Sequence, residues 1–329
     1  MSLPLSILDL APIAPGESAG QSIAASVALA QTAEEHGYQR VWYAEHHNMA
    51  TIASSAPAVV IAHVGARTRS IRLGSGGVML PNHSPLTVAE QFGTLEAMYP
   101  GRIDLGLGRA PGSDEATTHA LRRDPAASAS FPEDVQELRA YLAGRSRVPG
   151  VTAVPGAGSR VPLYVLGSST FGARLAAALG LPYAFASHFA PQSLGAAVAA
   201  YRSEFRPSEQ LERPHVIAGV NVVAADTTEQ AHDAYENVLR SFATSLFGRG
   251  RTFTEPEVDL LMGSAAGQHV RQMLAHAAVG TPPQVRQQLE EFRRFADADE
   301  LIVAHQARST EARLRSVVLL AEAMAGVAA

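Results

Sequence analysis

The sequence contains neither cysteine nor lysine, although it is 329 residues long. Without cysteine, the chain can form no disulfide, no zinc site with cysteine ligands and no cysteine nucleophile. Without lysine, Schiff-base chemistry by a lysine amine is excluded, and each of the 26 basic residues is an arginine. The composition fits a reducing compartment, and we expect a cytoplasmic protein.

Long apolar runs and basic patches are missing too. No apolar run approaches the length of about 18 residues that suggests a membrane-spanning helix. The N-terminal sequence MSLPLSILDL has the pattern of a strand and lacks a basic leader. No long basic patch indicates nucleic acid. We therefore expect neither a membrane segment nor a nucleic-acid partner.

Hydrophobic residues are abundant, at 47% of the chain against 17% charged residues. This balance favours a large core and argues against disorder. The length would allow two domains, yet α/β barrels commonly use it for one. We expect a single domain over residues 1–329.

Residues 71–112 contain a strand, a helix and a second strand. Residues 71–80 are almost continuously apolar, as in a parallel strand that is covered on both faces. Ser84 is the expected N-cap of the following helix, with Pro85 at its first position, and Pro100-Gly101 ends it. Residues 102–108 form the second strand. One helix between two strands predicts a right-handed crossover and a parallel sheet.

The rest of the chain repeats this alternation. Eight strands are expected at residues 5–10, 39–43, 71–80, 102–108, 162–166, 182–186, 215–224 and 300–304. Helices are expected between them, and this order favours a TIM (β/α)8 barrel. Insertions are expected after strands four and seven: residues 110–130 read as a polar loop, 144–160 as a Gly- and Pro-rich excursion, and 248–278 as irregular chain with a short helix.

Candidate functional residues gather where the strands end. The active sites of TIM barrels lie at the carboxyl face. The candidates by strand are His46 and His47 after strand two, Gly76 and Gly77 within strand three, Arg109 after strand four, Gly167 to Thr170 after strand five, and His188 after strand six. Five neighbouring loops that contribute in this way are stronger evidence than any one of them.

Three of these segments resemble the bacterial luciferase-like flavin-dependent monooxygenases. They are AEHH at 44–47, GGVMLP at 76–81 and GRIDLGLGR at 101–109. The similarity continues through the segment 166–182 to the last strand. The runs at 106–123 and 179–191 look like the single-gene, luciferase-like oxidoreductase branch and not the light-emitting enzyme. The resemblance implies a TIM barrel, FMN and a homodimer.

The resemblance implies that His46 is the catalytic histidine near the flavin. An imidazole suits proton transfer near neutral pH. The alternative is a loop histidine that holds the turn after strand two. His47 is expected to be structural, and Glu45 is expected beside the cofactor, where it could orient either ring. A metal site formed by these three residues is disfavoured, because adjacent histidines on extended chain point in different directions.

Glycines and one arginine are the expected flavin contacts. The resemblance places a non-prolyl cis peptide at Gly76-Gly77 against the flavin ring, and the absence of side chains permits close approach. The alternative is a barrel strand that needs small residues to pack. Arg109, after Gly108, matches a phosphate contact of the family, and a guanidinium suits a phosphate. A plain surface charge is the alternative.

The segment GSSTFG at 167–172 precedes a helix and could bind the phosphate through free backbone N–H groups. We include Gly167, Ser168, Ser169 and Gly172 in the cofactor site. Serine at a helix start is also ordinary capping. The family often has a hydroxyl residue where this chain has Gly172. His188 is expected to line the flavin or substrate side, with a core histidine as the alternative.

The expected function is that of a monooxygenase that uses FMNH2 and dioxygen on a small organic substrate, an apolar or carbonyl-bearing one. Residues 106–108, Gly-Leu-Gly, lack the further glycine of a nicotinamide fingerprint. A separate flavin reductase is therefore expected to supply the reduced flavin. Two alternatives remain open: a deazaflavin (F420)-dependent hydride-transfer oxidoreductase on the same barrel, and a non-catalytic flavin-binding protein.

Overall fold

Eight parallel strands close into a ring, which confirms the predicted TIM barrel. The computed structural model describes residues 3–14, 16–110, 114–248, 251–307 and 309–325. The strands of the ring are β1 (Leu5–Asp9), β2 (Arg40–Tyr43), β3 (Arg72–Met79), β4 (Ile103–Gly108), β5 (Leu163–Gly167), β6 (Tyr183–Phe185), β7 (Val216–Ala224) and β9 (Glu300–His305). Each strand pairs in parallel with the next, and β9 pairs with β1 to close the ring.

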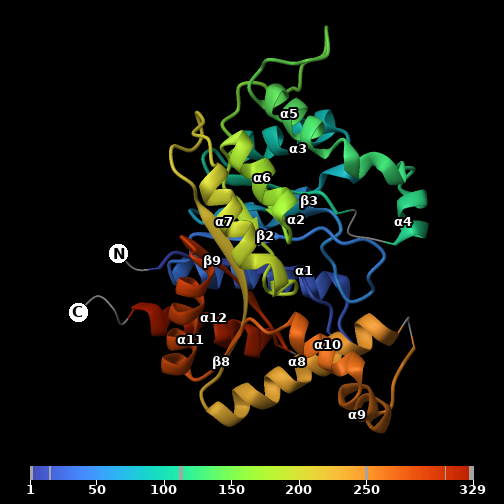
Figure 1. Ribbon diagram of the computed structural model, residues 1–329, viewed down its shortest axis with the longest axis vertical. Helices are drawn as coiled ribbons and strands as arrows, with labels where there is room; N and C mark the ends of the chain where they lie inside the picture. The colour runs from blue at the N-terminus through green and yellow to red at the C-terminus, as the bar shows by residue number, and fades with distance from the viewer. Residues whose placement is uncertain (1–2, 15, 111–113, 249–250, 308, 326–329) are drawn as a thin grey trace.

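Helices cover the outside of the ring (Figure 1). They are α1 (Ala19–Glu35), α2 (Pro57–Gly65), α3 (Pro85–Met98), α5 (Phe131–Leu142), α6 (Thr170–Leu179), α7 (Leu194–Glu204), α8 (Thr228–Gly248), α11 (Pro282–Ala296) and α12 (Thr310–Ala325). The predicted start of α3 is confirmed, since the Ser84 side chain accepts a hydrogen bond from the N–H of Thr87 and Pro85 is the first helical residue. None of the helices in the described part of the chain is long and apolar enough to cross a membrane.

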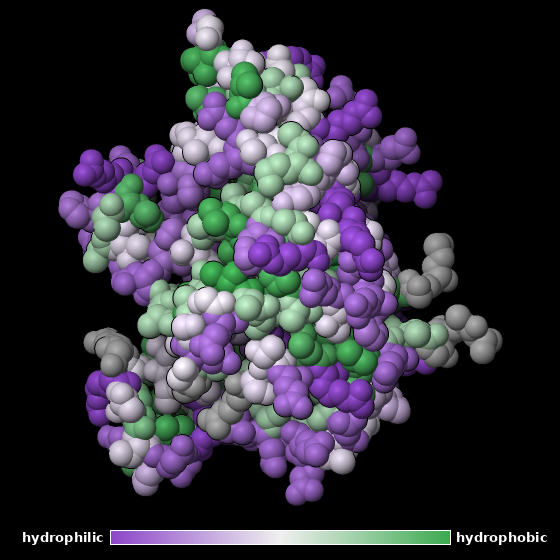
Figure 2. Space-filling model, turned by 180° about the vertical axis from the view of Figure 1, so that it is seen from behind, coloured by the Kyte–Doolittle hydropathy of each residue, from purple (hydrophilic) through white to green (hydrophobic). Residues whose placement is uncertain are grey.

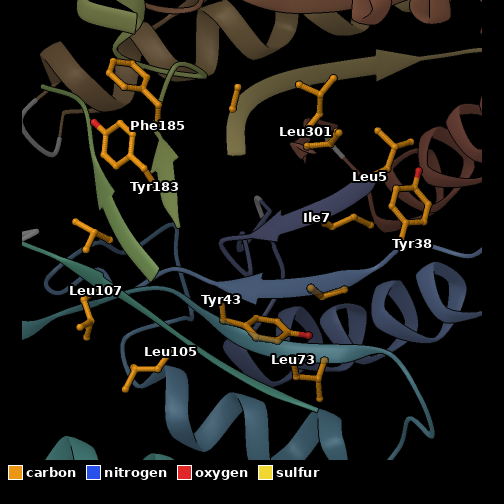
Figure 3. Packing of buried hydrophobic residues seen from close by; sticks show 14 of the residues in the cluster. Leu5, Ile7, Tyr38, Tyr43, Leu73, Leu105, Leu107, Tyr183, Phe185 and Leu301 are labelled. Carbon is orange, nitrogen blue, oxygen red and sulfur yellow. The ribbon is translucent and has the colours of Figure 1, made fainter. Parts of the chain in front are cut away.

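The main core lies between the strands and the surrounding helices. The outward-facing residues Ile7, Leu73 and Leu105 are fully buried in it. Figure 3 shows these side chains leaving their strands for the layer between sheet and helices. A second cluster fills the inside of the barrel and contains Leu8, Trp42, Ala44, Tyr164, Ala184, Ile217 and Ile302. Alternate residues of each strand thus enter different cores, as the period of two in a strand requires.

Charged side chains fill the amino end of the barrel. Arg40 donates to Asp104 at 2.8 Å, and its Nε lies 3.0 Å from Glu300. Arg72 also pairs with Asp104, and the hydroxyl of Tyr164 accepts from Arg40. Asp104 is fully buried, and every one of these charges has an opposite charge beside it. This layer closes the amino end, so a ligand must enter from the carboxyl end.

The insertions are more regular than predicted. The expected loop at 110–130 contains α4 (Glu115–Ala120) and a 3-10 helix, η2 (Pro125–Ala129), while residues 111–113 of it lie outside the described residues. The expected excursion at 144–160 has turns and no helix or strand.

The prediction of irregular chain with one short helix at 248–278 was wrong. It contains two helices, α9 (Glu255–Gly263) and α10 (Ala265–Met273), followed by a ninth strand, β8 (Ala277–Gly280). β8 pairs with the carboxyl half of β7, which is longer than its neighbours and extends beyond the ring. The helices pack on α8 around a small core of their own, which includes Leu239, Val258, Met262 and Val270. Figure 1 shows α9 and α10 beside one end of α8.

Candidate active site

His46 follows β2 at the carboxyl end of the barrel. Its backbone N–H donates to the carbonyl of Ser54 at 3.0 Å, which fixes the turn. The ring is half-buried, and its Nδ1 is shut off from solvent without a hydrogen-bond partner. Burial lowers the pKa of His46, and the opposing charge of Glu45 does not outweigh it. The imidazole is therefore neutral near pH 7.

Glu45 holds two other histidines and not His46. Its Oε1 lies 2.9 Å from His47 Nε2 and 2.8 Å from His83 Nε2, and its Oε2 accepts from the N–H of Met79 at 3.1 Å. Burial alone would raise the pKa of Glu45, but the hydrogen bonds from His83, His47 and Met79 outweigh it and lower the pKa. The carboxylate thus ties the end of β2 to the end of β3. Its contacts are with protein groups, so this geometry gives no support to the predicted cofactor contact.

His83 is a site residue that the sequence analysis missed. It follows the 3-10 helix η1 (Leu80–Asn82) directly after β3. The signal available in the sequence was a histidine in the turn segment PNHSP at 81–85, directly after a predicted barrel strand. Although Glu45, His47 and His83 meet, no group of three or more potential ligands among the described residues is arranged to hold a metal ion.

The peptide between Gly76 and Gly77 is cis, as the resemblance implied. A Cβ on Gly76 would lie 2.7 Å from Leu8 Cδ1 and 2.9 Å from Trp42 Cβ. A Cβ on Gly77 would lie 2.8 Å from the carbonyl oxygen of Gly106. Both glycines are therefore also needed for packing inside the barrel, which was the alternative explanation. The register of β3 against β4 shifts at this point, between Ser75 and Val78.

The side chain of Arg109 lies against the first turn of α6. It follows Gly108, the last residue of β4, and its guanidinium carbon lies 4.2 Å from the centre of the Phe171 ring. The N-cap of α6, Ser169, makes no side-chain hydrogen bond to the helix. The first turn of α6 thus keeps its backbone N–H groups free of a side-chain cap, beside a permanent cation. This is a suitable environment for a phosphate.

Gly167 and Gly172 bring β5 and α6 close together. A Cβ on Gly172 would lie 3.4 Å from Tyr183 Cε2 and 3.7 Å from Gly167 Cα. The Tyr183 hydroxyl donates to the carbonyl of Ser169 at 3.0 Å. These are ordinary contact distances, so packing alone does not require a glycine at position 172. Ser168 is exposed at the turn, next to the start of α6.

His188 follows β6, on the side of the ring opposite to β2. Its Nδ1 is buried without a partner, and a Cβ on Gly219 would lie only 2.4 Å from that atom. Burial, followed by the charge of His46, lowers the pKa of His188 to about 4. The side-chain amide of Asn221 donates to the His188 carbonyl. Asn221 was missed in the sequence, although a single amide within the apolar strand at 215–224 was a usable signal.

The segment after β4 folds back over the ends of β2 and β3. Arg123 Nε donates to the carbonyl of Asn82 at 2.9 Å, and Asn48 Nδ2 donates to Asp114 at 3.1 Å. α4 therefore stands at the rim of the carboxyl face (Figure 1). The structure thus places His46, His188, Arg109 and the start of α6 at the carboxyl end of the barrel.

Comparison with known proteins identifies the family. The sequence model of the family described as luciferase-like monooxygenase matches residues 3–298. A luciferase-like monooxygenase of Escherichia coli K12 is 46% identical over 321 residues, which are 97% of this chain and 96% of that protein. The N-acetyl-S-alkylcysteine monooxygenase of Bacillus subtilis is 45% identical over 194 residues, 55% of this chain and 56% of that protein. The crystal structure of apo-MsnO8 superposes with a TM-score of 0.88 at 36% identity and covers 98% of both chains. The chain is therefore an oxidoreductase that belongs to the luciferase-like monooxygenase family.

Proposed function

We propose that the protein is an FMNH2- and dioxygen-dependent monooxygenase that acts on a small organic substrate. What supports this proposal is that the neutral imidazole of His46, the Arg109 guanidinium and the first turn of α6, which lacks a side-chain cap, all lie at the carboxyl end of the barrel. Family membership supplies the reaction class. Reduced flavin comes from a separate reductase, because the sequence has no nicotinamide fingerprint.

The residues at the barrel mouth fit FMN. Arg109 and the first turn of α6 would hold the phosphate, by charge and by backbone N–H groups. Gly77 and Gly108 carry no side chain, although neighbouring protein atoms fill the space that a Cβ would take at each. When bound, the flavin supplies the redox chemistry with dioxygen. We include Gly76, Gly167, Ser168, Ser169 and His188 in this cofactor site.

The role of the chain is to position groups, to exclude water and to control protons. His46 is neutral at physiological pH, so its ring nitrogen can accept or donate a proton next to the reacting oxygen. Trp42, Leu8 and Ile217 form the dry floor of the mouth. The segment that includes α4 covers the opening from the β2–β3 side and limits the access of water.

We further propose a homodimer in the cytoplasm. Val59 on α2 is 68% exposed and Met98 on α3 is 49% exposed. Figure 2 shows hydrophobic surface near the middle of the face opposite to that of Figure 1. Large exposed apolar side chains on neighbouring helices are typical of a subunit interface. Light scattering coupled to gel filtration measures the mass, and Val59→Glu should convert a dimer to a monomer.

The decisive experiment is to identify the cofactor and its reaction. Absorbance spectra and equilibrium dialysis against FMN and F420 should show binding of FMN. With NADH and an FMN reductase, the protein should change the rate at which dioxygen is consumed. Selective binding of F420, with no effect on dioxygen, would replace this proposal by hydride transfer. Tight FMN binding with no effect on dioxygen would indicate a flavin-binding protein without catalysis.

A further inference from the structure

α4 lies at the rim of the carboxyl face and buries none of its own residues. The helix that follows it, α5, buries Phe131, Val135 and Leu138 in the main core. Figure 1 shows α4 apart from α3 and α5. A helix as short as α4 is not stable alone, because isolated helices need at least about 12 residues in water. The position of α4 therefore depends on the contacts at its two ends.

The first anchor of α4 is Asp114, its N-cap. The Oδ1 atom of Asp114 accepts from the N–H of Thr117 at 2.7 Å, and its Oδ2 accepts from Asn48 Nδ2 at 3.1 Å. Asn48 has a left-handed backbone, with φ of 56°, which asparagine adopts more readily than most residues. One carboxylate thus caps α4 and ties it to the turn after β2.

The second anchor is Arg123, just beyond the other end of α4. Its N–H donates to the carbonyl of Thr118 at 3.2 Å, and its Nε donates to the carbonyl of Asn82 at 2.9 Å. Asn82 is the last residue of η1, which follows β3. The two ends of α4 are thus held by two turns that belong to different strands.

Glu45 joins these same two turns. On the β2 side, its Oε1 lies 2.9 Å from Nε2 of His47, the residue before Asn48. On the β3 side, the carboxylate contacts both ends of η1, through the N–H of Met79 at 3.1 Å and Nε2 of His83 at 2.8 Å. Each anchor of α4 therefore contacts a chain segment that Glu45 binds directly.

Both anchors can hold only if the two turns keep a fixed separation. Helix geometry sets the distance between the ends of α4, at about 1.5 Å per residue. If the turns moved apart, α4 could follow only one of them, and the contact with the other would break. The ladder between β2 and β3 ends at the pair of Tyr43 and Ser75, so it does not reach either turn. Glu45 continues the connection beyond the end of the ladder.

We propose that Glu45 is a positioning residue that holds α4 at the rim of the carboxyl face, because it keeps the turn after β2 and η1 at the separation that both anchors need. Glu45 then acts on the reaction through α4 and not through contact with the flavin. This effect on the reaction rests on the proposed monooxygenase function, whereas the link between Glu45 and α4 does not.

The first test is hydrogen exchange of the full chain, followed by mass spectrometry. Glu45→Gln keeps the shape of the side chain but replaces one acceptor oxygen by an NH2 group, so the donors on one side of it lose their acceptor. The amides of residues 117–123 should then exchange roughly tenfold faster, the effect of losing one hydrogen bond to a charged group. The amides of α5 should keep their rates. Unchanged exchange of residues 117–123 would overturn the proposal.

Two further variants show whether the effect is specific. His83→Ala breaks the contact on the η1 side alone, at a half-buried position, and should also accelerate exchange in residues 117–123. Asp104→Asn makes the same change of carboxylate to amide in the buried charge layer at the amino end. It should not accelerate residues 117–123 relative to α5. An equal response of Asp104→Asn and Glu45→Gln would show general destabilisation and refute the link.

The two anchors are tested by a mutant cycle. Asn48→Ala removes the first anchor, and Arg123→Met removes the donor of the second while keeping most of the side-chain stem. Each should accelerate exchange in residues 117–123. In the protein that carries both substitutions, Glu45→Gln should add little, because no anchor is left to be positioned. A full additional effect of Glu45→Gln would contradict an action through the anchors.

The effect on the reaction is measured with NADH and an FMN reductase. Glu45→Gln and Arg123→Met should both release more hydrogen peroxide per NADH oxidised, because a displaced α4 admits water to the flavin site. An unchanged ratio in spite of faster exchange would overturn the action of Glu45 on the reaction. Absence of FMN binding to the wild type would instead overturn the proposed function, and the exchange result would stand.

Discussion

The guanidinium of Arg109 lies over the ring of Phe171, with 4.2 Å between the guanidinium carbon and the ring centre. A stacked guanidinium keeps its charge and most of its N–H donors, while its orientation is restricted. Phe171 is the second residue of α6, so the stacking places the cation beside the free N–H groups of that helix. Neither residue needs the other for folding, since both are exposed.

Arg109→Ala should therefore weaken flavin binding without unfolding the barrel. A charge-assisted contact to phosphate contributes about 1.5 to 3 kcal/mol, so the affinity for FMN should fall roughly ten- to a hundredfold. Riboflavin, which lacks the phosphate, should bind the variant and the wild type alike. Calorimetry with both ligands measures this. The control is Arg174→Ala on α6, where the arginine pairs with Glu204. Equal losses for both flavins would show that Arg109 does not bind the phosphate.

In His46→Ala, we expect dioxygen to oxidise the reduced flavin with little formation of product. The ring makes no hydrogen bond to the protein in the described part of the chain, so the variant should melt within about 4 °C of the wild type. It should still bind FMN. Loss of the proton-transferring group should reduce the rate of product formation by about a hundred- to ten-thousandfold. Hydrogen peroxide released per NADH oxidised should then rise in the coupled assay with reductase. An unchanged ratio would remove His46 from the mechanism.

Asp104→Asn should destabilise the barrel from its amino end. Asp104 is fully buried between Arg40 and Arg72, and the substitution removes the charge that both guanidinium groups face. Breaking a buried ion pair on one side costs about 3 to 5 kcal/mol. Urea denaturation followed by circular dichroism measures the loss. Asp226→Asn, at an exposed pair with Arg315, is the control and should leave the midpoint unchanged. Equal stability of the two variants would show that the layer contributes little.

Glu34 should give a pH-dependent contribution to stability. Burial alone would raise the pKa of Glu34, but the N–H groups of Ser70, Ile71 and Arg69 donate to its carboxylate and lower the pKa to about 2. Because the folded-state pKa is depressed, the stabilisation is complete above the unfolded value of about 4.5 and is lost as the pH falls towards 2. Glu34→Gln should cost about 1 to 2 kcal/mol at pH 7 and progressively less as the pH falls through 2.

The exposed neighbour Glu35→Gln is the control for this measurement. Chemical denaturation at pH values from 7 down to 2 gives the difference between each variant and the wild type. A cost for Glu34→Gln that persists unchanged at the lowest pH would show that the stabilisation does not depend on the charge of the carboxylate.

The repeating elements could be predicted because local signals marked them. The apolar run at 71–80 and the Ser84-Pro85 helix start predicted the β3–α3 unit to within one residue. β8 could not be found in this way. Its four residues, Ala-Ala-Val-Gly, have no strand period, and they form a strand only because β7 extends beyond the ring and offers them an edge.

The site residues were predicted by position, but their contacts were not. The ends of parallel strands indicated that His46, Arg109 and His188 lie at one face. Glu45 binds His83 because β3 and η1 bring this histidine next to it, although the two residues are 38 positions apart in the sequence. The sequence carries no local signal for such a contact. Gly172 of α6 is a similar case, because its neighbour Tyr183 lies on β6.

The layer of paired charges around Arg40 closes the amino end of the barrel, so the interior opens only at the carboxyl end. Two ligands that share it cannot pass one another, so the one that lies deeper has to arrive first and depart last. The order in which the two ligands bind would then be set by the shape of the barrel and not by their relative affinities. In initial-rate measurements, the deeper ligand would act as the leading reactant of a compulsory sequence, and an excess of the outer ligand would trap it inside.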